Sequence, residues 1–235
     1  MENSSMTVRM SAFARACHAR ETEPKIFDGS MAEALLGKAE YDDAGSLADG
    51  IGCFCPGFSR SRTEAVNWAV RRRLAPTPLA RAGIVPPENL RLVPADLSAP
   101  GWPRALEEAG FDARARSFCS LLGLVCYLSP EEFDGLLAAL SARMPRGSAL
   151  AFDYPVRADA APEQAELARA AGEEMRGAYT RGELERLLAG TGFLAYEHPG
   201  PAELTDRVFR SYNAAHPEAP MAAGERVNCC LAVPQ

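Results

Sequence analysis

From residue 90 to residue 233, short apolar runs alternate with segments that carry helix-start and helix-stop residues. This alternation predicts a parallel, doubly wound α/β sheet, because each parallel strand needs a helical crossover to reach the next one. The expected strands cover residues 90–94, 117–128, 148–154, 193–197 and 227–233. The last strand follows a helix and a turn, which leaves open an antiparallel position at the edge of the sheet.

Two helix starts in this half are well marked. Ser129 precedes a proline and two glutamates, which predicts an N-cap serine, a proline in the first turn and favourable acids there. Thr180 and Glu183 have the spacing of a capping box. The expected helices cover residues 103–110, 130–143, 162–176, 183–189 and 201–213. The nearly continuous apolar run 117–128 predicts a central strand that is buried on both faces.

The first 82 residues have a different pattern. Helices are expected over 6–20, 30–36 and 62–74, and the first of them has an apolar stripe formed by Met6, Met10, Phe13 and Cys17. The stretch 38–61 is rich in glycine, aspartate and serine and predicts a loose connection. Its glycine-rich part, 50–57, has no strand-like run before it, so we interpret it as a surface loop.

Composition narrows the class of protein. A formal net charge of −6 argues against nucleic acid or an anionic membrane as the main partner. No apolar run reaches the ~18 residues that a membrane span requires, and Met1 to Met10 lack the apolar core of a signal peptide. We therefore expect a cytoplasmic protein whose seven cysteines are thiols. No zinc-ligand spacing is present, so no metal site is expected.

Several segments, in order along the chain, resemble one known family. Arg9 to His18, Pro24 to Asp28 and the segment 74–81 are similar to the N-terminal lid of the leucine carboxyl methyltransferase-like family of bacterial S-adenosylmethionine-dependent methyltransferases. Residues 89–97, 123–128 and 147–154 resemble its third and fourth cofactor motifs and its fifth strand. The resemblance implies a helical lid over 1–82, a Rossmann-like class I methyltransferase sheet over 83–235, and S-adenosylmethionine as the cofactor.

One part of the family pattern is missing. The family has a first strand, a glycine-rich loop and a second strand ending in an acid between the arginine that aligns with Arg81 and the third motif. Here Arg81 is followed almost directly by Asn89. The missing unit would be on the order of 30 residues. We therefore predict an incomplete sheet and a weakened cofactor site, because the loop and the acid normally hold the methionine and ribose parts.

The resemblance assigns roles to a few residues. Arg81 would pair with the cofactor carboxylate, Asp96 would bind the adenine amine with Leu97 packed nearby, and Arg9 and Gly123 would complete the cofactor site. Tyr127 is the candidate on the substrate side. The alternatives remain a solvated Arg81, a turn or N-cap Asp96, and a core or rim Tyr127. Relatives often have a glutamate directly before the glycine that aligns with Gly123, whereas this chain has Leu122 there.

The family implies methyl transfer to a carboxylate or hydroxyl of a small molecule. A catalytically inactive pseudo-methyltransferase that serves as a binding or scaffold protein is the alternative, and a truncated product that folds only as an oligomer is a third. A dehydrogenase is disfavoured, because the sequence lacks the glycine fingerprint of that class. A serine or cysteine hydrolase is unsupported, because no nucleophile has a base at a recognisable spacing.

Overall fold

The computed structural model describes three ranges and a few isolated residues. These are residues 37–50, 95–157 and 175–235, with Phe13, Ala34, Gly83, Val85, Arg91 and Val93. Most of the predicted N-terminal helices and the predicted helix 162–176 therefore lie outside the described residues. Phe13 and Ala34 are helical, as predicted. The described residues test neither the predicted boundary between lid and sheet at residue 82 nor the predicted gap before Asn89.

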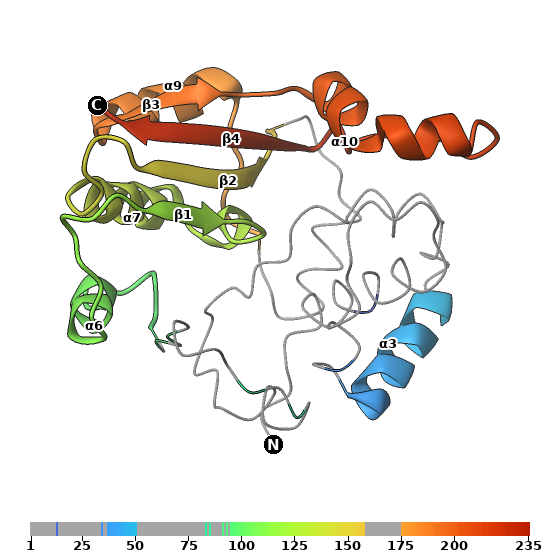
Figure 1. The fold of residues 1–235 in the computed structure, drawn as a ribbon, viewed down its shortest axis with the longest axis horizontal. Coiled ribbons are helices and arrows are strands. Elements are labelled where there is room, and N and C mark those ends of the chain that lie inside the picture. The colour runs from blue at the N-terminus through green and yellow to red at the C-terminus, as the bar shows by residue number, and fades with distance from the viewer. Residues whose placement is uncertain are drawn as a thin grey trace.

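A mixed sheet of four strands forms the centre of the described structure (Figure 1). The strands are β1 (Phe118–Leu121), β2 (Ala149–Pro155), β3 (Phe193–Glu197) and β4 (Val227–Pro234), in the order β1-β2-β4-β3. β1 and β2 are parallel, and β4 is antiparallel to both of its neighbours. The last strand is thus antiparallel, but it lies between β2 and β3 and not at the edge of the sheet.

The described helices are α3 (Lys38–Gly50), α6 (Trp102–Glu108), α7 (Pro130–Ser141), α9 (Arg181–Gly190) and α10 (Pro201–Ala215), with a 3₁₀ helix η1 (Val125–Tyr127) after β1. Two of them, α7 and α9, begin where their predicted capping residues lie. Ser129 and Glu132 form a complete capping box at α7, and Thr180 and Glu183 form another at α9. Each box satisfies two backbone N–H groups that the first helical turn would leave unpaired.

The core lies on one face of the sheet. Along β2, the side chains of Leu150, Phe152 and Tyr154 are buried and alternate with partly exposed ones. Phe133 of α7 contacts Phe152 with ring centroids 5.6 Å apart, and Leu184 of α9 belongs to the same core. Figure 1 shows α7 and α9 on this side of the strands. This burial is the main source of the stability of the sheet.

The prediction of a long central strand over 117–128 is wrong beyond residue 121. Gly123 has φ of +67°, a left-handed conformation that ends the strand, and η1 then turns Val125 into the core. The run is apolar because a buried turn follows a short strand. β1 is also not covered on both faces, since Phe118 is 68% exposed. Among the described residues, no strand pairs with its outer edge.

Two further predictions fail within the described residues. The loose stretch 38–61 is helical over 38–50, where the Ser46 hydroxyl donates to the Asp42 carbonyl one turn earlier and so has its partner within α3. The predicted strand 90–94 is absent at Arg91 and Val93, the two residues of it that are described. A strand needs a hydrogen-bonded neighbour, and none of the four described strands pairs with this segment.

Replacing Ser129 by alanine should lower the free energy of unfolding by about 1 kcal/mol, because the Glu132 N–H at the start of α7 loses its hydroxyl acceptor. Urea denaturation followed by circular dichroism measures the change. Ser46→Ala is the control, since the Ser46 hydroxyl bonds only to a carbonyl within α3. Equal stability of the Ser129 variant and the native chain would contradict the capping role.

Candidate functional site

The turn after β1 lies where open α/β sheets bind their ligands, at the carboxyl end of parallel strands. It consists of Gly123, Leu124 and η1, and we call it the Gly123 turn. A Cβ added to Gly123 would meet no atom of the described residues within 4 Å, so among these residues space adjoins this backbone. Such space allows a ligand to approach the peptide group closely. The turn joins Gly123 and Tyr127, two residues that were assigned from the sequence.

Asp153, near the carboxyl end of β2, holds the Gly123 turn. Its Oδ1 accepts the Gly123 N–H at 2.5 Å. Burial raises the pKa of this carboxyl to about 6, against a smaller lowering by the hydrogen bond from Gly123. Sequence reasoning did not assign this residue. The available signal was a lone acid in the apolar strand Ala149–Pro155.

A second set of contacts holds the same turn from the other side. The N–H groups of Arg176 and Gly177 both donate to the Cys126 carbonyl, at 2.8 and 3.1 Å, and the Arg176 Nε donates to the Tyr127 carbonyl at 3.1 Å. Arg176 also forms an ion pair with Glu132 of α7 at 2.8 Å. We call Arg176 and Gly177 the 176–177 clamp. Its contacts link the turn to the start of α7.

The Tyr127 side chain is 8% exposed and contributes to the buried core. This burial fits the core or rim alternative that the sequence left open. A substrate contact would use the small part of this residue that is exposed. The role of Tyr127 on the substrate side therefore stays a prediction, as does the contact of Gly123 with the cofactor.

Asp96 and Leu97 belong to a separate turn. Asp96 is exposed, and its Oδ1 accepts hydrogen bonds from the Ser98 N–H at 3.0 Å and from the Ser98 hydroxyl at 2.6 Å. These bonds form the turn that was one of the two alternatives for this aspartate. Leu97 packs against the main core. The adenine contact stays a prediction, and Arg9 and Arg81 lie outside the described residues.

A buried polar cluster lies on the core side of the sheet. The Tyr154 hydroxyl is 2.6 Å from Nε2 of His198 and accepts a longer hydrogen bond from Asn228. The His198 side chain is 3% exposed, and burial lowers the pKa of its imidazole. Burial also raises the pKa of Tyr154. The cluster connects β2, β4 and the start of the segment after β3, so we interpret it as structural.

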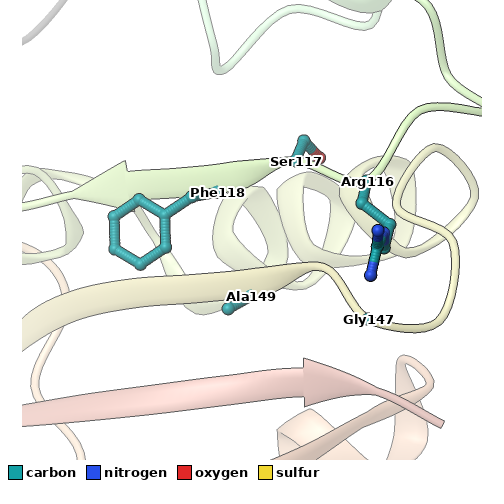
Figure 2. Close-up of a pocket in the computed structure, with 5 residues that line it drawn as sticks. All are labelled: Arg116, Ser117, Phe118, Gly147 and Ala149. Carbon is teal, nitrogen blue, oxygen red and sulfur yellow. The ribbon is translucent and has the colours of Figure 1, made fainter.

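A shallow hollow lies at the opposite end of β1 and β2. Figure 2 shows its lining, formed by Arg116, Ser117, Phe118, Gly147 and Ala149. Arg116 reaches across to Gly147, where an added Cβ would lie 2.8 Å from its side chain. This hollow adjoins the amino ends of the two strands, whereas ligands of open α/β sheets bind at the carboxyl ends. We therefore place the candidate site at the Gly123 turn.

Other kinds of site are not indicated within the described ranges. Four cysteines there, Cys119, Cys126, Cys229 and Cys230, are thiols, and burial raises the pKa of Cys119 to about 11 and that of Cys230 to about 12. No cluster of three metal-ligating side chains occurs among residues 37–50, 95–157 and 175–235. In the same part of the chain, no helix is both long and apolar enough to cross a membrane.

The strand order and the antiparallel β4 define the class of protein: the described part is a class I methyltransferase-like α/β sheet. A solved methyltransferase-class protein from Thermobifida fusca has this fold, with a TM-score of 0.57 and 18% identity, over 86% of this chain and 92% of that one. The model of the leucine carboxyl methyltransferase family matches residues 74–141. These matches confirm the resemblance to that family.

Two relatives carry the comparison further. YktD of Bacillus subtilis, classed with S-adenosyl-L-methionine-dependent methyltransferases, is 26% identical over 88% of this chain and 91% of its own length. A Mycobacterium ulcerans protein of the same class is 42% identical over 52% of this chain, but the match spans only 37% of that protein. The YktD alignment runs over 279 positions, which exceeds the 235 residues of this chain, so YktD has residues without a counterpart here.

Proposed function

We propose that the chain is an S-adenosylmethionine-dependent O-methyltransferase that acts on a carboxylate or hydroxyl of a small molecule. The match to YktD over 88% of this chain and 91% of that protein is the observation that carries the proposal. The carboxyl end of β1, where the backbone turns at Gly123, is the position at which open α/β sheets bind their ligands. By family resemblance, Arg81, Asp96, Leu97 and Arg9 would hold the cofactor beside this turn. The cofactor would supply a methyl group bound to its sulfonium sulfur, which leaves as a neutral thioether.

With a carboxylate acceptor, the chain itself has little acid–base work to do, whereas a hydroxyl acceptor would have to give up its proton to a base or to water. Methyl transfer depends mainly on the alignment of the acceptor with the methyl group. The Gly123 turn, fixed by Asp153 and by the 176–177 clamp, supports such alignment because both of its ends are hydrogen-bonded. A carboxylate acceptor needs no base, since it is already ionised near neutral pH.

The missing family segment favours the second candidate, a pseudo-methyltransferase that does not turn over substrate. We propose that the strand–glycine loop–strand unit is absent between Arg81 and Asn89, which the excess length of the YktD alignment supports. Such a chain would keep the back half of the sheet and lose several kcal/mol of cofactor binding, at about 1.5–3 kcal/mol for each charged hydrogen bond.

Calorimetric titration with S-adenosylmethionine separates the two candidates. For the enzyme we expect micromolar binding that weakens by about tenfold or more in Arg81→Ala and Asp96→Ala, because each loses a charged hydrogen bond. Asp134→Ala is the control, since Asp134 is an exposed carboxylate on α7 that has no assigned role in the candidate site. Absence of heat at millimolar ligand would reject the enzyme and favour the pseudo-methyltransferase.

A further inference from the structure

Asp153 is placed differently from Glu197, the other acid of the described strands, which forms an ion pair with Arg207. Asp153 lies two residues before the end of β2, on the side of the strand opposite to the buried Phe152 and Tyr154. Its Oδ1 reaches across to the first residue of the Gly123 turn. Even a half-buried carboxylate loses part of its hydration, which hydrogen bonds must replace. The bond from the Gly123 N–H supplies part of that replacement and ties the carboxylate to the turn.

The Gly123 backbone needs such a partner. At a φ of +67° it leaves the strand, so its N–H no longer continues the ladder of hydrogen bonds with β2. The paired register ends at Leu121 and Phe152, one residue before Asp153. The carboxylate thus replaces the strand as the acceptor at the point where the chain turns. A charge-assisted bond of this type is stronger than a neutral one.

We propose that Asp153 is a positioning residue, which fixes the Gly123 turn and thereby the predicted cofactor and substrate contacts at Gly123 and Tyr127. This inference rests on the proposed function. Asp153 acts through the turn, and the methyl group never passes to it. A substitution of Asp153 that keeps an acceptor oxygen preserves the geometry of the Gly123 turn. One that removes the oxygen leaves the Gly123 N–H without this acceptor.

Among the described residues, two thiols lie close to this carboxylate and its turn. Cys229 pairs with Asp153 from β4, and the Cys126 sulfur lies 3.8 Å from the Gly123 carbonyl. The nearby arginines have other partners: Arg157 binds Glu183, and Arg176 binds Glu132. A pH titration of the Gly123 amide is therefore expected to report the protonation of Asp153.

The test uses the full chain with Asp153→Asn and Asp153→Ala, and Asp134→Ala as a control. In amide NMR spectra of the native chain, the Gly123 resonance should titrate with a midpoint near pH 6, because its acceptor titrates there. The titration should vanish in Asp153→Asn. In calorimetry with S-adenosylmethionine, Asp153→Ala should bind on the order of tenfold more weakly, while Asp153→Asn stays within about threefold of the native chain.

Three outcomes would overturn the inference: a Gly123 amide that does not titrate between pH 4 and 8, native affinity in Asp153→Ala, or equal losses in both variants. Equal losses would indicate that the charge itself contacts a ligand. If the native chain binds no S-adenosylmethionine, the proposed function fails, and the Gly123 titration still decides whether Asp153 fixes the turn. Asp153→Asn keeps the test valid should the alanine variant fold poorly.

Discussion

Replacing Gly177 by alanine should lower the free energy of unfolding by about 3 kcal/mol, because the new methyl group would overlap backbone atoms. An ideal Cβ at this position lies 2.4 Å from the Val125 carbonyl oxygen and 2.8 Å from that of Leu128. Neither oxygen belongs to a side chain that could rotate away. Relief would require the 176–177 clamp to withdraw from η1, which would break its hydrogen bonds to Cys126.

Urea denaturation measures this effect, and the chain provides a matched control. Gly135 lies within α7, and a Cβ added there meets nothing within 4 Å. Gly135→Ala should therefore raise the free energy of unfolding by about 0.5–1 kcal/mol, as alanine is the better helix former. If Gly177→Ala were as stable as Gly135→Ala, the close packing of the clamp on η1 would be wrong.

The features that the sequence predicted well depend on neighbours in the chain. The capping boxes at Ser129 and Thr180 and the strand 193–197 match the structure because their signals lie within a few residues. The run 117–128 misled because burial in a turn and burial in a strand select the same apolar residues. α3 was missed because glycine and aspartate weigh against a helix only weakly when tertiary contacts support it.

The parts of the candidate site that were missed depend on contacts between distant segments. Asp153 meets Gly123 across 30 residues, and Arg176 meets Tyr127 across 49. Spacing along the chain contains no signal for either pair. Gly123 was assigned from the family resemblance, and Tyr127 was chosen for its place at the end of the predicted strand, which in the structure is the end of η1. The prediction of a strand at residues 90–94 failed for a related reason, since its expected partners would be among the strands that we propose to be missing.

The open edge of β1 indicates what the proposed gap costs. β1 is the edge strand of the described sheet, whose order is β1-β2-β4-β3. Its Phe118 is 68% exposed. An unpaired edge leaves a row of backbone donors and acceptors without strand partners. In a complete sheet of this class, the first strand would pair there and present its glycine-rich loop beside the Gly123 turn.

Inserting the corresponding segment of YktD between Arg81 and Asn89 should therefore tighten S-adenosylmethionine binding by on the order of 100-fold or more, the equivalent of two charged hydrogen bonds. Calorimetry measures the affinity, and a glycine–serine linker of equal length is the control for added chain. The insert should also protect the β1 amides from hydrogen exchange, since the new strand pairs with them. Affinity no higher than that of the linker control would show that cofactor binding by this chain does not depend on the unit that we propose to be missing.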